Sequence, residues 1–139
     1  MSTTRSGLHV LHMLADHALA EAGPVLAQAL RAHAQAGQAA RECEEVLQQA
    51  RSELARLARA PAINPVACDR VRELVHAAHL RDADARRQLA QAERSLDDAR
   101  AELGRRRQRE ADLARARTQE CEALRRAQQQ RDEAALDDL

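Results

Sequence analysis

The sequence has no phenylalanine, tryptophan or tyrosine, and only four glycines and three prolines in 139 residues. A packed globular core depends on large side chains, whereas the apolar residues here are mostly alanine, a strong helix former. The scarcity of glycine and proline leaves few positions for turns. These absences exclude the all-β and α/β classes and favour long helices or a coiled coil.

Lysine is also absent, so all 22 basic residues are arginines, and they are balanced by 22 acids. A net charge of zero removes any whole-chain argument for a nucleic-acid partner. The three cysteines, Cys43, Cys68 and Cys121, form no CxxC pair, and we recognise no secretory signal, so we expect a reducing, cytoplasmic setting. No apolar run approaches the ~18 residues of a membrane span, so we expect no membrane insertion.

One segment ends the helical pattern completely: residues 60–65, which contain two of the three prolines. Pro61 cannot continue a helix and biases Ala60 away from helical angles. Asn64 is a favoured N-cap, and Pro65 suits the first position of a new helix. We therefore expect a disordered N-terminus over 1–7, a helix over 8–60, a turn over 61–65, a second helix over 66–136 and an acidic end over 137–139.

The first helix carries an a/d heptad pattern over seven heptads. Steps of three and four residues from Leu8 meet an apolar residue at every position except Glu53. The positions are Leu8, Leu11, Ala15, Ala18, Ala22, Val25, Ala29, Ala32, Ala36, Ala39, Cys43, Val46, Ala50, Glu53 and Leu57. Gly23 and Pro24 interrupt the helix without changing this phase, which predicts a kink or a looser first segment.

The second helix has a similar pattern up to residue 103. Its positions are Cys68, Val71, Val75, Ala78, Asp82, Ala85, Leu89, Ala92, Leu96, Ala99 and Leu103. Beyond Gly104 the same phase meets mainly polar residues, and residues 104–131 hold nine arginines against four acids. We therefore predict an all-α fold, an antiparallel two-helix coiled-coil hairpin in the form of a long rod with its turn near 60–65, and a basic overhang over 104–131.

Few residues indicate chemistry. The pairs His9/His12 and His76/His79 each share a helix face, but with no further ligand recognised we expect solvated surface rather than a metal site. Cys43 and Cys68 fall on the heptad pattern, where cysteine acts as a small apolar residue. With no phosphate loop and no recognisable nucleophile, we expect no enzyme activity, cofactor or metal.

The arginine cluster at residues 105–109 allows three interpretations: a solvated face, a docking surface for an acidic protein, or contact with nucleic-acid phosphates. Without aromatic side chains to stack on bases, nucleic acid is the weakest of the three. Membrane-surface binding is also disfavoured, because the apolar faces lack bulky anchors.

The order of these features resembles a known family. A Leu-x-x-Leu-Ala stretch ending at Ala15 opens a long helix rich in Ala, Gln, Glu and Arg, a break follows near residue 60, and a longer helix comes next. The chain closes with the sequences READL (109–113), QQQR (128–131) and DEAA (132–135). This layout resembles the FliJ/YscO/SctO family, the central-stalk coiled coils of flagellar and virulence-associated type III secretion systems.

The resemblance implies a cytoplasmic protein, peripheral to the inner membrane, whose paired ends enter a hexameric export ATPase and promote its assembly and activity. It also implies contact with the export gate and with export chaperones. Arginine suits carboxylates in such a pore, and the candidate residues are Arg105, Arg106, Arg107, Arg109, Arg115 and Arg117. The candidate export-gate residues are Val46, Ala50, Val71 and Val75.

Two other classes remain open. A chaperone-escort protein would grip a client through exposed apolar residues such as Leu113 and Leu124. A generic scaffold would associate strongly through its alanine-rich seam, whereas a stalk should be a monomer or a weak dimer. Whether the system is flagellar or an injectisome also stays open.

Overall fold

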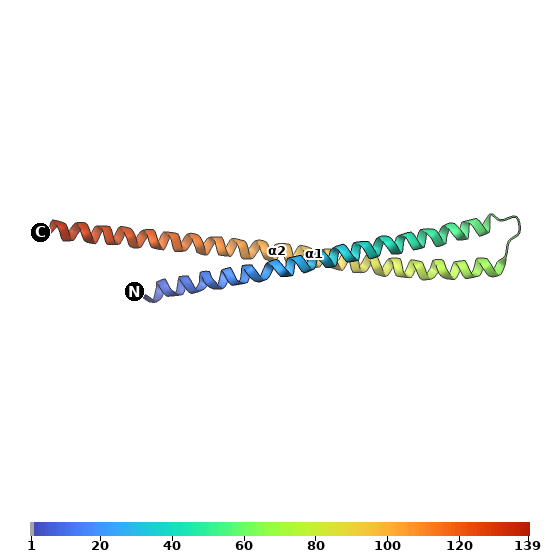
Figure 1. Cartoon of the computed structure of the whole chain (residues 1–139), viewed down its shortest axis with the longest axis horizontal. Helices are drawn as coiled ribbons and strands as arrows, with labels where there is room; N and C mark the ends of the chain where they lie inside the picture. Colours follow the sequence, from blue (N-terminus) through green and yellow to red (C-terminus); the bar gives the residue numbers. More distant parts are fainter. Residues whose placement is uncertain (1) are drawn as a thin grey trace. The chain divides into compact units, whose positions relative to one another are not determined.

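The computed structural model describes the backbone of residues 2–139 and the side chains from Gly7 onward. It contains two helices, α1 (Ser2–Ala58) and α2 (Pro65–Asp137), and no strand among the described residues (Figure 1). The predicted all-α class is confirmed. α1 begins at Ser2, inside the segment 1–7 that we expected to be disordered, and Met1 lies outside the described residues.

The two helices are joined by residues 59–64, close to the predicted turn. The amide of Ala60 donates to the carbonyl of Leu57 at 3.3 Å, and Pro61 follows without an amide hydrogen to continue the helix. The Asn64 side-chain oxygen accepts a hydrogen bond from the Ala67 amide at 3.3 Å. Asn64 is therefore the N-cap of α2, and Pro65 is its first helical residue, as the sequence predicts.

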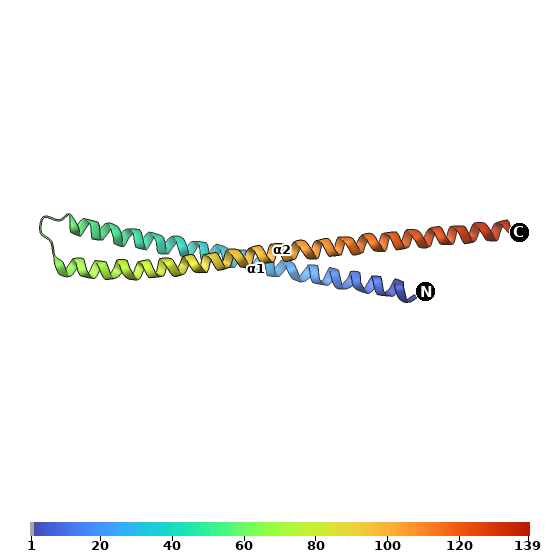
Figure 2. The same ribbon diagram turned by 180° about the vertical axis from the view of Figure 1, so that it is seen from behind.

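The chain divides into two compact units. Unit 2, Ala27–Asp98, is an antiparallel hairpin made of the second half of α1, the joining loop and the first half of α2 (Figures 1 and 2). Its buried apolar residues are Leu47, Cys68, Ala78, Ala85 and Leu96. Unit 1 combines α1 up to Leu26 with Ala99–Leu139, and Ala15 and Ala22 are buried in it.

In α1, every second residue of the predicted heptad pattern is replaced in the interface by the residue that follows it. The alternate predicted positions are kept, because alanines such as Ala15 and Ala22 are buried. Leu47 is 3% exposed, whereas the predicted Val46 is 50% exposed. At every second predicted position, beginning with Leu11, the residue that follows the predicted one is buried or half-buried. These residues are His12, Leu19, Leu26, His33, Ala40, Leu47 and Leu54.

The cause of this shift is side-chain size. A helix with 3.6 residues per turn can present either row to its neighbour, and the later row holds four leucines where the predicted row holds alanine, valine and glutamate. A buried leucine removes more apolar area from water than a buried alanine or valine, and each Å² removed stabilises the fold by about 25 cal/mol. The row with the leucines therefore faces the partner helix.

The pattern predicted for α2 fits the structure, because every one of its positions from Cys68 to Leu103 is buried or half-buried. Asp82 is the exception in polarity, since this carboxylate is 4% exposed in unit 2. One of its oxygens, Oδ2, forms a salt bridge with Arg86 Nε at 3.0 Å, and the other, Oδ1, has no hydrogen-bond partner among the described residues.

The predicted overhang over 104–131 is wrong in its extent. In unit 1, Arg106 donates to the carbonyl of Ala18 at 2.7 Å, and Glu110 and Arg117 both contact His12. The joining loop centres the hairpin near residue 62, so residues just after Gly104 lie against α1 instead of extending past it. From Cys121 onward all side chains except half-buried Ala127 are exposed.

α1 also continues without interruption through Gly23 and Pro24, where we expected a kink or a looser segment. Among the described residues, no helix is long and apolar enough to cross a membrane.

Candidate functional site

Three groups that can ligate a metal meet in unit 1. His12 and Asp16 lie one turn apart on α1, and Glu110 approaches from α2. His12 Nε2 lies 3.0 Å from Glu110 Oε1 and 3.8 Å from Asp16 Oδ1. The His12 side chain is only 15% exposed. The structure thus corrects our expectation of a solvated His9/His12 pair, because His12 faces α2.

A fourth residue, Arg117, fixes the tautomer of His12. Its Nη1 lies 2.8 Å from His12 Nδ1. Arginine is a donor only, so neutral His12 must accept at Nδ1 and carry its proton on Nε2, from which it donates to Glu110. The cluster is therefore a hydrogen-bonded chain in which His12 connects a basic and an acidic residue of α2.

The six arginines proposed to contact the export ATPase fall into three groups. Arg106 and Arg117 face α1 and are held by contacts within unit 1. Arg105 pairs with Glu102 at 2.7 Å, and Arg115 pairs with Asp112, each within α2. Arg107 and Arg109 are exposed, and neither has a hydrogen bond or salt bridge within the described part of the chain.

Glu102 precedes the six arginines on α2. Its carboxylate accepts hydrogen bonds from Arg105 at 2.7 Å and from Arg106 at 2.8 Å. The hydrogen bond from Arg105, and then the one from Arg106, lowers the pKa of the Glu102 carboxyl below its ordinary value of 4.5. Glu102 therefore stays charged at lower pH than a free glutamate. Because Arg105 is 68% exposed, its pair with Glu102 adds little to stability and can exchange for a partner's carboxylate.

A groove in unit 1 is lined in part by Arg106 and Arg109. Apolar side chains of α1 form one side, and charged side chains of α2 form the other. The lining residues are Leu11, Leu14, Ala15, Ala18, Glu102, Arg106 and Arg109. Leu11 and Leu14 are 45% and 59% exposed. An apolar strip with an arginine at its edge suits a helix that is apolar on one face and acidic beside it.

The four residues proposed for the export gate all belong to unit 2. Ala50, Val71 and Val75 are half-buried and lie on the interhelical seam, whereas Val46 is half-exposed beside buried Leu47. Of the four, Val46 presents the most apolar surface to a partner.

Comparisons with models of known protein families, with curated proteins and with solved structures found no match to this chain.

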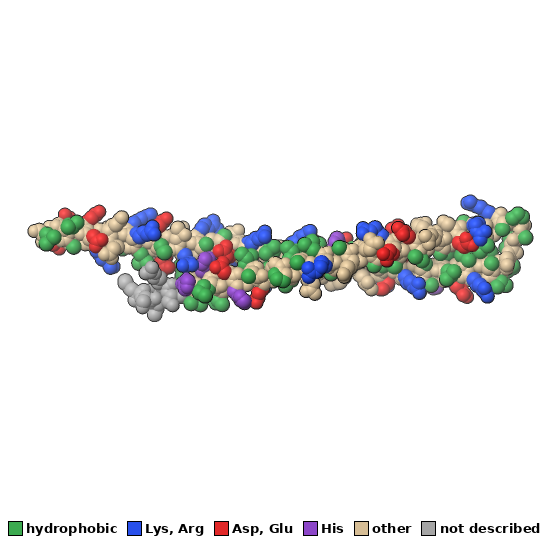
Figure 3. Space-filling view, viewed as in Figure 1, with side chains coloured by type: hydrophobic (Ala, Val, Ile, Leu, Met, Phe, Trp, Pro, Cys, Tyr) green, Lys and Arg blue, Asp and Glu red, His purple; other side chains and the backbone are tan. Residues whose placement is uncertain are grey.

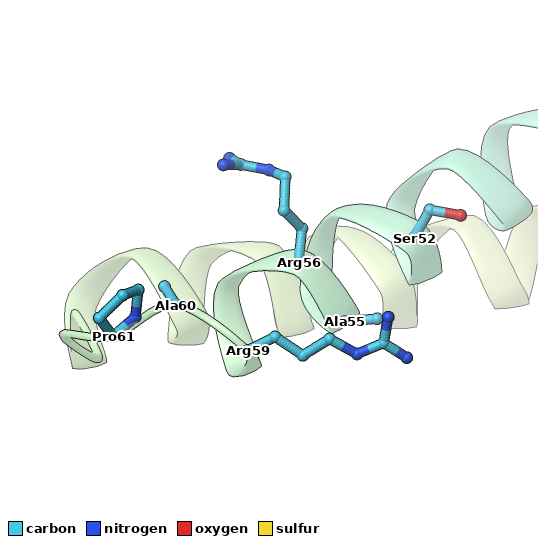
Figure 4. A pocket seen from close by; sticks show the side chains of 6 residues that line it. All are labelled: Ser52, Ala55, Arg56, Arg59, Ala60 and Pro61. Atoms are coloured by element: carbon cyan, nitrogen blue, oxygen red, sulfur yellow. The ribbon is translucent and has the colours of Figure 1, made fainter.

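A hollow lies near the joining loop, and no histidine, cysteine or carboxylate is among its lining residues (Figure 4). It is lined by Ser52, Ala55, Arg56, Arg59, Ala60 and Pro61. The guanidinium groups of Arg56 and Arg59 point in different directions, so they do not converge on a common point. Arg56 is engaged by Glu53, whose pKa its hydrogen bond lowers.

The cysteines and the second histidine pair differ in how deeply they are buried. Cys68 is buried and Cys43 is half-buried, as expected for apolar seam residues, whereas Cys121 is exposed. His76 and His79 are exposed on α2. Figure 3 shows basic and acidic side chains interspersed along the visible surface, in agreement with a net charge of zero.

The sequence signal that we missed was the spacing of His12 and Asp16, an i, i+4 pair of potential ligands on one helix face. Glu110 could be added only once the alignment of α2 against α1 was known, because it lies 98 residues away from His12.

Proposed function

We propose that the chain is a non-enzymatic central-stalk protein of a type III secretion or flagellar export apparatus, which binds the hexameric export ATPase and promotes its assembly and activity. The observation that carries this proposal is the pair of exposed, unbonded arginines, Arg107 and Arg109, on the same unit that brings together the N-terminal part of α1 and the C-terminal part of α2. The resemblance in sequence layout supplies the partner.

The contacts within unit 1 support a narrower choice of arginines for the proposed ATPase surface. Arg106 and Arg117 are engaged with α1, so replacing either one would also remove a contact within unit 1. Arg107 and Arg109 are free to form bidentate hydrogen bonds with carboxylates in the pore. Arg105 and Arg115 add to this surface by exchanging exposed intrahelical salt bridges that contribute little to stability.

The test is equilibrium binding of the full chain to the cognate export ATPase. The variant Arg107→Glu/Arg109→Glu should weaken binding at least tenfold, and wild-type binding should weaken as the salt concentration rises. Arg70→Glu/Arg81→Glu is the matched control, because both residues are exposed and the change in charge is the same, but they belong to unit 2. Unchanged binding by the unit 1 variant would contradict the arginine assignment.

A second candidate function is that of a chaperone-escort protein, favoured by the exposed apolar residues near the start of α1. Val10, Leu11, Met13 and Leu14 are each 45% to 59% exposed. Such a patch on a helix is typical of a partner-binding face. If this is the principal function, Leu11→Gln/Leu14→Gln should abolish chaperone capture, and Arg107→Glu/Arg109→Glu should leave it intact.

A further inference from the structure

The cluster of His12, Asp16 and Glu110 has the composition and spacing of a metal site. It offers one imidazole nitrogen and two carboxylates, and its three ligand atoms all lie within 4.8 Å of one another. Two ligand atoms bound about 2.1 Å from one zinc ion at a tetrahedral angle lie about 3.4 Å apart. The distances from His12 Nε2 to Glu110 Oε1, 3.0 Å, and to Asp16 Oδ1, 3.8 Å, lie on either side of that value.

The three groups also differ from a chance surface cluster in their placement. Glu110 comes from α2 and the other two ligands from α1, so an ion held here would connect the two helices of unit 1. The His12 and Glu110 side chains are 15% and 27% exposed, whereas Asp16 is 56% exposed. The site is thus partly shielded on the side of the seam and open to water on the side of Asp16.

We propose that His12 Nε2, Asp16 and Glu110 form a binding site for one divalent transition-metal ion, with zinc as the best match to a nitrogen and two carboxylate oxygens. Three protein ligands leave one tetrahedral position for water. The proposal is independent of the secretion-stalk function.

The contact between Arg117 and His12 affects how strongly His12 can bind a metal. Binding of metal at Nε2 requires the imidazole proton to move to Nδ1, where it can no longer accept from Arg117. The guanidinium must then turn away, and its positive charge opposes the ion. Arg117 therefore competes with the metal for His12, and removing its charge should strengthen metal binding.

The first experiment is a calorimetric titration of the reduced, metal-free full chain with Zn²⁺. We expect saturation at one ion per chain for the site, lost in His12→Ala and weakened at least tenfold in Glu110→Gln and in Asp16→Asn. His17→Ala is the matched control, because His17 and Glu21 form a pair 3.0 Å apart on the same helix but are 73% and 60% exposed and have no third ligand. Binding by the control should match the wild type.

Co²⁺ serves as the second probe, because its absorption reports the ligand set. The site contains no thiolate, so the cobalt complex should lack a sulfur-to-metal charge-transfer band, and its spectrum should be much weaker in Glu110→Gln at the same cobalt concentration. A thiolate band, or a spectrum unchanged in Glu110→Gln, would overturn the proposal, because the ion would then be held by cysteines or by α1 alone.

The deciding variant is Arg117→Gln, which removes a native hydrogen bond but supplies a carbonyl oxygen that can accept from Nδ1–H. Outer-shell partners of this kind change metal affinity by about 10- to 100-fold. We expect Zn²⁺ to bind at least about tenfold more tightly to Arg117→Gln than to the wild type. Equal or weaker binding would overturn the competition between Arg117 and the metal for His12, and no binding of Zn²⁺ by the wild type would show that His12, Asp16 and Glu110 form a hydrogen-bonded network without metal affinity.

Discussion

The alignment of α1 against α2 is most directly probed by comparing two adjacent residues, Val46 and Leu47. Leu47 is 3% exposed, and Leu47→Ala removes about three buried carbon groups. At about 0.8 kcal/mol for each, the free energy of unfolding should fall by about 2.4 kcal/mol. The range measured for leucine-to-alanine changes in protein cores is about 2–5 kcal/mol, and a two-helix interface belongs at its lower end.

Val46 is 50% exposed, so Val46→Ala removes about two carbon groups that are only half-buried, a loss of about 0.8 kcal/mol. Alanine has a higher helix propensity than valine, which offsets about 0.5 kcal/mol of that loss. The net change should therefore be no more than about 0.5 kcal/mol.

The assay is urea unfolding followed by ellipticity at the helix minimum, with both variants compared at the same protein concentration. Leu47→Ala should lower the urea midpoint clearly, and Val46→Ala should leave it nearly unchanged. A larger loss for Val46→Ala than for Leu47→Ala would refute the alignment and restore the heptad positions that the sequence pattern alone suggested.

Three further predictions follow from single contacts. Replacing Arg105 by glutamine should raise the pKa of Glu102 toward 4.5, as read from its carboxyl resonance by NMR. Because the pKa is lowered in the folded chain, the contribution of this group to stability is present above the ordinary pKa and is lost as the pH falls, so the variant should show a smaller loss of stability on acidification. Asn64→Ala should cost about 1 kcal/mol of unfolding free energy, and Asn64→Asp, which keeps the cap, should not. Asp82→Leu should raise the urea midpoint, because it removes a buried carboxylate oxygen without a partner, and a lowered midpoint would show that Asp82 contributes to folding.

The sequence predicted most of the fold because its local signals agree. Alanine and arginine favour helix throughout, and Pro61, Asn64 and Pro65 mark the only interruption between the two helices. The α2 seam was also predictable, because only one row of apolar residues runs along it. These features depend on nearest neighbours and on helix periodicity alone.

The alignment of the two helices was harder to predict, because α1 offers two adjacent apolar rows. Leu19, Leu26, Leu47 and Leu54 are spaced at multiples of seven residues, a signal strong enough to select the buried row had side-chain size been weighed. The extent of the overhang depended on the same alignment. Placing Arg106 beside Ala18 requires the position of the loop and the start of α1 to be known together.

The candidate site was the least predictable part. Of the six arginines, the sequence could not separate Arg106 and Arg117, which face α1, from Arg107 and Arg109, which face solvent. That distinction depends on helix phase beyond Gly104, where polar residues occupy the seam and the hydrophobic pattern no longer reports it.

The central claim, that this chain acts as a stalk for a type III export ATPase, is tested most directly by titrating the full chain into the cognate ATPase while following ATP hydrolysis and hexamer formation. The proposal predicts that both rise and saturate near one chain per hexamer, and that Arg107→Glu/Arg109→Glu loses the effect while Arg70→Glu/Arg81→Glu retains it. An active ATPase whose rate and assembly do not respond to the wild-type chain would contradict the proposal and leave the escort function as the better account.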